Sequence, residues 1–323
     1  MTRAAYPGEQ RTEKGRRSVG RTQTQEPASD SSDRGNSVRQ AANSAEGLAN
    51  QAGYKARSVV SAPWFTALAR LGYAAKGLVY IIIGWLALMT AVSAGGQTTD
   101  PQGAITAIYQ YPFGKVLLFV IFVGFVGYAL WQFARAVFNP DGEGDAKKDG
   151  VRRIGYAVVG VSYLSFALAA LRLMLQNAAP KGSNATTQDW TARLMSAPGG
   201  VALVVLLGLI MLGVAIGLFY EAWKLRFERY FPLGQMNEVE RKLTRYTGRF
   251  GIGSLGAIFV VMSIFLIEAA IHHDPHKAQG LAGALATLAA QPFGPLLLGL
   301  IALGLVAYGV FGWVEARYRR IHA

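Results

Sequence analysis

The sequence predicts an all-α integral membrane protein with six transmembrane helices, arranged as three parallel two-helix repeats. Three observations indicate this fold. The chain of 323 residues is 52% hydrophobic and only 16% charged, whereas a soluble domain carries about a quarter charged residues. One short motif opens a long apolar segment three times, and most basic residues fall on one side of these segments.

The repeated motif is an arginine followed two residues later by Gly-Tyr, or by Gly alone in the third copy. Its copies are Arg70-Leu71-Gly72-Tyr73, Arg153-Ile154-Gly155-Tyr156 and Arg249-Phe250-Gly251. A second apolar segment follows each copy after a turn, at Pro112-Phe113-Gly114, Pro198-Gly199-Gly200 or Pro292-Phe293-Gly294. The unit of the chain is therefore a pair of apolar segments.

Each apolar segment is long enough to cross a membrane. A helix needs about 20 residues to cross roughly 30 Å of hydrocarbon. Only a helix satisfies its own backbone hydrogen bonds there without partner strands. We therefore expect helices over the six segments, which are residues 71–93, 115–138, 154–176, 200–222, 251–271 and 294–316.

Basic residues predict the orientation of these helices. One side, made of residues 1–76, 135–153, 224–249 and 317–320, holds 27 of the 32 Lys and Arg residues, and the other side holds 5. Because basic loops stay in the cytoplasm, we expect both termini there. Contact with the bilayer and its anionic headgroups at this face explains the formal charge of +13 without a nucleic-acid partner. The sequence indicates no particular protein partner.

Residues 1–60 differ from the rest of the chain because they are rich in Arg, Gly, Ser, Gln and Glu. Such a segment buries too little apolar surface to offset its ordering entropy, so we expect a disordered, basic, cytoplasmic tail. The remainder divides into repeat 1 at residues 63–140, repeat 2 at 150–230 and repeat 3 at 246–321. With two spans each, all three repeats enter the membrane in the same direction, which favours a bundle with a pseudo-three-fold axis.

The loop inside each repeat carries a further helical signal. Asp100-Pro101 is typical of a helix cap and a first helical position. Ile108, Leu194 and Leu288 stand at one offset from the three turn glycines. We expect a short amphipathic helix on the outer surface in each repeat.

These features resemble a bacterial family known as domain of unknown function 1206. The Arg-x-Gly-Tyr opening, the surface helix, the Pro-Phe-Gly turn and a second span with Gly124, Gly127 and Tyr128 carry the resemblance over residues 63–320. Repeat 2 departs from it, with a Pro-Gly-Gly turn and Val214 in place of the tyrosine. The resemblance implies three paired-helix domains in a multi-pass bacterial plasma-membrane protein and brings no activity with it.

Three ionisable residues inside the predicted spans are candidates for function, because a charge at the bilayer centre costs roughly 2.5–3.5 kcal/mol on insertion scales. Lys76 lies within the first span, where its stem would allow it to snorkel to the cytoplasmic surface. Arg172 and Glu268 occupy the same position in repeats 2 and 3. They either pair across the pseudo-axis or reach water separately.

A second set lies at the cytoplasmic ends of the even-numbered spans. Arg135, Glu221 and Glu315 each follow a turn glycine by 21 residues. Mixed charges at equivalent positions would allow a ring of ion pairs that closes a cavity. The alternative is a set of solvated helix ends, whose exposed pairs contribute little.

The sequence contains no pattern typical of an enzyme. The chain has no cysteine, which excludes thiolate ligands and cysteine nucleophiles, and no serine triad, paired carboxylates or phosphate loop is present. A weak metal candidate is the cluster of His272, His273, Asp274 and His276, although neighbouring loop histidines point apart. We expect no catalytic residues, no cofactor and no metal.

Two functions remain open. The first is a non-enzymatic membrane component that acts through assembly or lipid contact. The alternative is a small transporter or channel with a polar cavity on the pseudo-three-fold axis. A transporter would line that cavity with some of Tyr80, Tyr163, Gln132, Ser162 and Ser263, whereas a scaffold would fill the axis with Gly, Ala, Leu and Phe.

Overall fold

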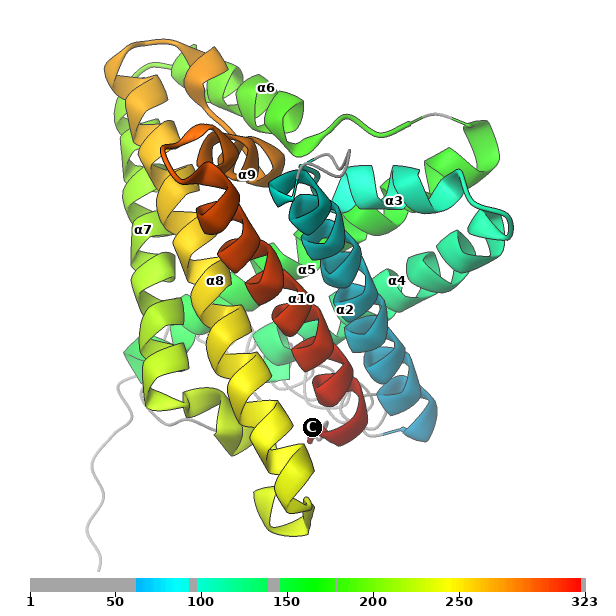
Figure 1. Ribbon diagram of the computed structural model, residues 1–323. Coiled ribbons are helices and arrows are strands. Elements are labelled where there is room, and N and C mark those ends of the chain that lie inside the picture. Colours follow the sequence, from blue (N-terminus) through cyan, green and yellow to red (C-terminus); the bar gives the residue numbers. More distant parts are fainter. Residues whose placement is uncertain (1–61, 93–97, 139–145, 178, 321–323) are drawn as a thin grey trace, which may run out of the picture. The chain divides into compact units, whose positions relative to one another are not determined.

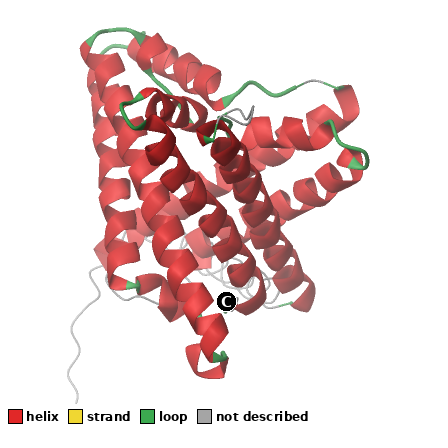
Figure 2. Cartoon of the chain, in the orientation of Figure 1, coloured by secondary structure: helices red, strands yellow, loops and turns green. Residues whose placement is uncertain are grey.

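The computed structural model describes residues 62–92, 98–138, 146–177 and 179–320, and these residues form helices and loops without a strand (Figures 1 and 2). Among the described residues, six helices are long and apolar enough to cross a membrane, which confirms the predicted fold class. The predicted tail at residues 1–60 lies outside the described residues. The long helices are α2 (Pro63–Ala91), α4 (Gly114–Phe138), α5 (Ala146–Gln176), α7 (Gly200–Lys224), α8 (Glu238–Ile271) and α10 (Gly294–Tyr318).

The long helices pack in the order α5, α4, α2, α10, α8 and α7, as their contacts show. Repeats 1 and 3 form compact hairpins, because α2 packs on α4 and α8 packs on α10. The two helices of repeat 2 do not pack on each other in this way, since α5 packs on α4 and α7 on α8. Figure 1 shows the outer ends of α5 and α7 well apart. The expected three-fold arrangement is therefore broken at repeat 2.

Glycines allow the central helices to approach closely. A methyl group added at Gly77 of α2 would lie 2.5 Å from the Gly309 carbonyl oxygen of α10, and one added at Gly309 would lie 2.5 Å from the Gly77 carbonyl oxygen. Open space surrounds Gly213 and Gly217 of α7 instead, because a methyl group added at either position would meet nothing within 4 Å.

The Pro-x-Gly motif forms the same turn in each repeat. Phe113, Gly199 and Phe293 adopt a left-handed backbone with φ of 66°, 72° and 63°. The glycine that follows donates its N–H to the carbonyl three residues earlier, as in a type II turn with proline at its second position. A side chain on that glycine would collide with the end of the preceding short helix. Repeat 2 therefore keeps the turn although its sequence departs from Pro-Phe-Gly.

Three short helices lie at the outer end, as predicted: α3 (Pro101–Tyr109), α6 (Ser183–Met195) and α9 (Leu281–Ala290). Asp100 caps α3 by accepting from the Gly103 N–H at 2.7 Å and also accepts from the Ser183 N–H at the start of α6. Asn184 accepts from Gly280 at 2.9 Å and Gly283 at 3.0 Å, at the start of α9. Two side chains thus join the three helix N-termini.

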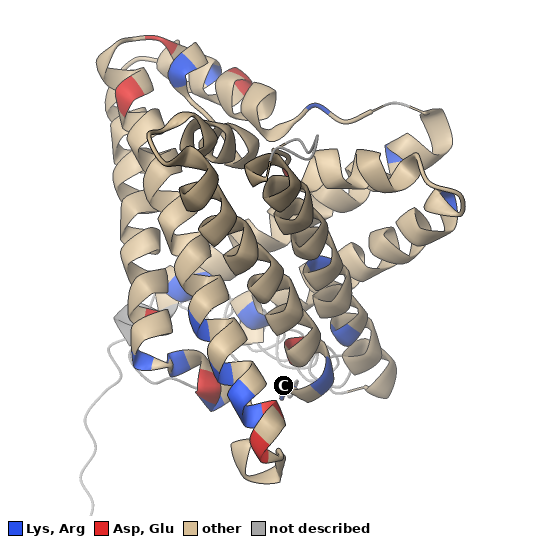
Figure 3. Cartoon of the chain, in the orientation of Figure 1, with Lys and Arg blue, Asp and Glu red and all other residues tan. Residues whose placement is uncertain are grey.

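The opposite end of the bundle is basic. Figure 3 shows Lys and Arg gathered at this end, where α7 ends and α8 starts. A 3-10 helix, η1 (Arg226–Tyr230), follows α7 at this end and packs Phe227 against Phe311 of α10, with ring centroids 5.2 Å apart. This end is the one that the distribution of basic residues assigns to the cytoplasm.

Candidate functional site: a charged cavity inside the helix bundle

A cavity of about 190 Å³ lies inside the basic end of the bundle, and we call it the basal cavity. All six long helices and η1 contribute to its wall. The lining consists of aromatic, charged and apolar side chains from Tyr73, Lys76, Tyr128, Arg135, Tyr156, Leu218, Glu221, Phe227, Tyr230, Ile252, Tyr308, Phe311, Glu315 and Arg319.

The repeats build this cavity from equivalent positions. The residues that follow the glycine of the opening motif, Tyr73, Tyr156 and Ile252, all line it. So do Arg135, Glu221 and Glu315, the charged set at the ends of the even-numbered spans, so the structure brings these three residues to one cavity. Tyr128 and Tyr308 share a further offset, whereas Val214 at that position in repeat 2 is exposed. The basal cavity therefore keeps much of the pseudo-symmetry that the outer end has lost.

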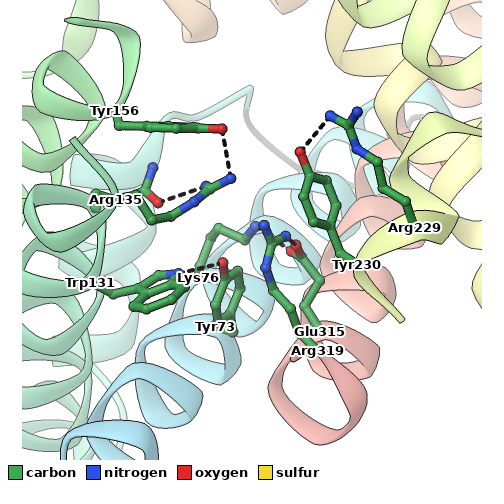
Figure 4. Close-up of polar contacts among 10 residues, drawn as sticks. Tyr73, Lys76, Trp131, Arg135, Tyr156, Arg229, Tyr230, Glu315 and Arg319 are labelled. Carbon is green, nitrogen blue, oxygen red and sulfur yellow. Dashed lines mark hydrogen bonds and ion pairs between the residues drawn. The ribbon is translucent and has the colours of Figure 1, made fainter. Parts of the chain in front are cut away.

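The centre of the site is an ion-paired triad of Lys76, Glu315 and Arg319 (Figure 4). The Lys76 ammonium donates to Glu315 Oε2 at 2.8 Å, and the Arg319 guanidinium donates to Glu315 Oε1 at 2.5 Å. All three side chains are 4–6% exposed. Burial of charge is tolerated when each ion is paired and hydrogen-bonded. The expectation that Lys76 snorkels is wrong, because a carboxylate within its reach replaces water.

Three tyrosine rings surround the Lys76 ammonium. Its Nζ lies 5.1 Å from the ring centroid of Tyr73, 5.4 Å from Tyr128 and 5.0 Å from Tyr308. The Tyr73 hydroxyl in turn accepts a 3.0 Å hydrogen bond from the Trp131 indole N–H. Cation–π contacts away from water are worth about 2 kcal/mol. The rings therefore provide the Lys76 ammonium with favourable electrostatic contacts that the hydrocarbon of the bilayer cannot provide.

Arg135 forms a second charged centre on α4. Its guanidinium donates to Gln132 Oε1 at 3.1 Å and to the Tyr156 hydroxyl at 2.8 Å, and lies 3.8 Å from the Tyr156 ring centroid. Tyr156 ties this centre to α5. Glu221 of α7 lines the same cavity and is half-buried, so the wall reaches the protein surface beside it.

The segment η1 completes the wall of the basal cavity. The Arg319 guanidinium carbon lies 4.3 Å from the Tyr230 ring centroid. Arg229 donates a 2.7 Å hydrogen bond to the Tyr230 hydroxyl, as Figure 4 shows. The Tyr230 carbonyl accepts from the Arg320 N–H at 3.1 Å, which ties η1 to the residues after α10.

The outer pair of candidates is not brought together. Glu268 accepts a 3.2 Å hydrogen bond from Lys277 and lies 4.0 Å from His272. Arg172 is exposed on α5, which packs on α4. The pairing of Arg172 with Glu268 is therefore not formed, since it required repeats 2 and 3 to be related by an intact axis.

The histidine cluster does not form a metal site. Asp274 uses its Oδ1 to accept from the His276 N–H at 3.0 Å, and His273 has a left-handed backbone with φ of 54°. Within the ranges that the structure describes, no group of three or more His, Cys, Asp or Glu residues could hold a metal ion. The weak metal candidate at His272, His273, Asp274 and His276 thus lacks the geometry of a ligand set.

Sequence reasoning missed several parts of the basal cavity. Arg319 follows Glu315 by four residues, the spacing at which side chains meet on a helix face, so this pairing signal was present. Tyr73 and Tyr156 were visible as motif residues but gave no indication that they face a cavity. No local pattern marked Tyr230, because its place depends on the fold of η1 against α10.

Comparison with known proteins gives the family. The family described as Domain of Unknown Function (DUF1206) matches residues 71–139, 154–224 and 250–319. Bacillus subtilis (strain 168) has a similar protein, described as uncharacterized protein YxxB, which is 36% identical over 260 residues, covering 80% of this chain and 93% of that protein. No solved structure matches the chain. The chain belongs to the DUF1206 family, as its repeated motifs predicted.

Proposed function

We propose that this member of the DUF1206 family is a small transporter of the bacterial plasma membrane that binds a small anionic solute in the basal cavity. The observation that carries the proposal is the buried charge of the cavity wall. Ionisable groups within membrane helices face substrate or ion pathways as a rule, because their cost there is high. Besides Lys76, Glu315 and Arg319, which pair with one another, the described wall carries a further cation, Arg135.

The charge and size of the basal cavity indicate the class of solute. Its described lining has three cations, Lys76, Arg135 and Arg319, and two carboxylates, Glu221 and Glu315. An excess of positive charge favours an anion, and guanidinium groups match carboxylate or phosphate oxygens. The volume of about 190 Å³ is below the roughly 300–1,000 Å³ of sites for drug-sized ligands. We therefore propose a carboxylate or phosphate compound of a few heavy atoms.

The orientation is part of this proposal. Basic residues at the end that holds the cavity favour a cytoplasmic location for both termini, with anionic headgroups in contact with this face. At the outer end, the side chains of Asp100 and Asn184 connect the N-termini of α3, α6 and α9. The five residues that the sequence suggested for an axial cavity are absent from the described lining of the basal cavity. One of them, Gln132, accepts a hydrogen bond from Arg135 of that lining and holds it in place. The solute site would thus face the cytoplasm.

A second candidate is a membrane component that acts through assembly or lipid contact. The observation that favours it is the uncovered face of α7, where Gly213 and Gly217 meet nothing within 4 Å. Small residues on a membrane helix allow another helix to approach closely. In this second candidate function, the protein acts through the outer surface of the bundle, and the basal cavity has no role.

The two candidates are separated by a binding and uptake experiment on the full chain. Purified protein in detergent would be heated with acetate, lactate, phosphate, neutral glycerol or cationic choline, and any stabilising compound would be offered in radiolabelled form to proteoliposomes. A ligand at 100 times its Kd stabilises by about 2.7 kcal/mol. We expect an anion to raise the melting temperature of wild type and of Arg245→Gln, whose side chain is exposed, but not of Arg135→Gln.

The outcomes of this experiment are distinct. Stabilisation by an anion followed by uptake supports the transporter. Stabilisation without uptake contradicts transport and favours a non-transporting membrane component. Equal stabilisation of the Arg135→Gln variant would show that the anion binds elsewhere, and no stabilisation by any anion would contradict the proposed solute class.

A further inference from the structure

A second concave site lies at the other end of the bundle, beneath the short helix α6. It has a volume of about 540 Å³ and is bounded by α6, α7 and α8. Figure 1 shows α6 beside the outer ends of α7 and α8. We call it the outer pocket. None of its lining residues lines the basal cavity, so it is a separate site.

The lining of the outer pocket changes character with depth. Its rim carries Thr186, Thr187 and Arg193 from α6 together with Gln279. Below the rim, the walls are apolar and are formed by Val204, Leu207 and Met211 of α7 and by Met262 and Leu266 of α8. A polar rim above an apolar slot matches an amphiphile, with its headgroup at the rim and its chain in the slot.

The depth of the slot agrees with the length of a lipid chain in one leaflet. Met211 is 11 residues from the first residue of α7, which corresponds to about 16 Å along the helix axis. Half of a hydrocarbon core of roughly 30 Å is about 15 Å. The apolar walls therefore extend from the level of α6 to about the middle of the bilayer.

Access to the pocket from the membrane follows from the opening of repeat 2. Among the described elements, α7 packs mainly on α8 and makes smaller contacts with α6 and η1. Leu207 is 44% exposed and Met211 is half-buried, whereas Val204 is fully buried, so the slot is open to chains in the bilayer at Leu207 and Met211. A lipid could enter sideways without any movement of the helices.

The charge at the rim selects the headgroup. Arg193 is the cation of the lining, and none of the described lining residues is acidic. Asp189 also lies on α6, but it accepts a 2.7 Å hydrogen bond from Lys181, and this ammonium lowers the pKa of the carboxyl. Trp190 packs its ring 5.7 Å from the Arg193 guanidinium carbon. Guanidinium groups bind phosphate oxygens through parallel hydrogen bonds.

We propose that the outer pocket is a binding site for a phospholipid with an anionic headgroup, taken from the leaflet that contacts α6. Arg193 binds the phosphate, the threonine hydroxyls and Gln279 bind the remaining headgroup oxygens, and one acyl chain lies between α7 and α8. The site goes beyond the proposed transport function and does not depend on it.

The test is lipid retention by the full-length protein, measured by native mass spectrometry. Protein reconstituted with phosphatidylglycerol and phosphatidylcholine in equal amounts would be returned to detergent and stripped progressively. We expect wild type to retain one phosphatidylglycerol, and Arg193→Gln to lose about tenfold in affinity, since a charged hydrogen bond is removed. Met211→Trp should abolish retention because it fills the slot.

Matched controls distinguish a built site from general lipid contact. Arg172→Gln removes another exposed outer cation, and Leu209→Trp adds the same bulk to a side chain of α7 that is 52% exposed and outside the pocket. Both should retain the lipid as wild type does. Equal loss in a control, full retention by Arg193→Gln, or equal retention of phosphatidylcholine would each overturn the proposal. The exposed site of Arg193 keeps this test valid even if Met211→Trp fails to fold.

Discussion

Lys76 and Glu315 are 239 positions apart in the chain, yet the Lys76 ammonium donates a 2.8 Å hydrogen bond to the Glu315 carboxylate inside the bundle. The pair joins α2 to α10, and the contact between these two helices is the most extensive among the described elements. Glu315 also accepts from Arg319, so one carboxylate serves two buried cations. We therefore expect substitution of Glu315 to lower the free energy of unfolding more than substitution of either cation of the triad.

Replacement of Glu315 is expected to destabilise the protein more than replacement of Lys76. Glu315→Gln leaves two buried cations without their carboxylate and should cost about 3–5 kcal/mol. Lys76→Met leaves Glu315 paired with Arg319 and should cost less. The double variant should cost less than the two single costs added together, because the residues interact directly. Unfolding of the purified protein in detergent measures all three.

The exposed pair Lys242–Glu238 provides the control for this series. Its two side chains are 64% and 78% exposed, and Lys242→Met should cost about 0.5 kcal/mol or less. A strictly additive double variant, or a Glu315→Gln variant as stable as Lys242→Met, would show that the triad does not hold the bundle together.

A second prediction concerns the contact between α2 and α10. Gly309→Ala places a methyl group 2.5 Å from the backbone oxygen of Gly77, which has no flexible side chain that could yield. Overpacking of this kind costs about 1–3 kcal/mol. Gly213→Ala on α7 is the matched control, since open space surrounds it and alanine favours helix by up to about 1 kcal/mol. Melting temperatures should fall for the first variant and not for the second, and the reverse order would contradict the packing described.

A third prediction concerns the outer end. Asp100→Ala removes the acceptor of the Gly103 and Ser183 N–H groups and should cost about 0.5–2 kcal/mol, the range for loss of a helix cap. Hydrogen exchange should become faster at these two amides, while the amides of α9, which Asn184 caps, change little. Asp274→Ala, at an exposed cap, should have a small effect. Unchanged exchange at Ser183 would show that Asp100 does not join α3 to α6.

Much of the fold was predictable because membrane helices are specified by local features. The apolar length of each span, the Asp100-Pro101 cap and the Pro-x-Gly turns are all read within a few residues. The family followed from the same motifs. These features satisfy backbone hydrogen bonds within one segment, so no knowledge of distant contacts was required.

The arrangement of the spans was less predictable. Arg135, Glu221 and Glu315, which share one repeat offset, all line one cavity. The same logic failed for Arg172 and Glu268, because Arg172 lies on α5, which packs on α4, whereas Glu268 lies on α8, which packs on α7 and α10. Equal sequence offsets guarantee equal places only where the repeats pack equally. For Lys76, the decisive partner lay 239 positions away, beyond any local pattern.

We propose that the basal cavity is a polar site within a membrane bundle and that it opens to the cytoplasm. Because the chain has no cysteine, single cysteines placed on α7 test it directly with a charged, membrane-impermeant thiol reagent. Leu218→Cys lines the cavity, and Ile216→Cys lies on the same helix, 61% exposed and outside the cavity. We predict that Leu218→Cys reacts only from the cytoplasmic side, while lipid shields Ile216→Cys from either side. A Leu218→Cys variant that stays unreactive, or that reacts from the outer side, would show that the basal cavity does not open to the cytoplasm.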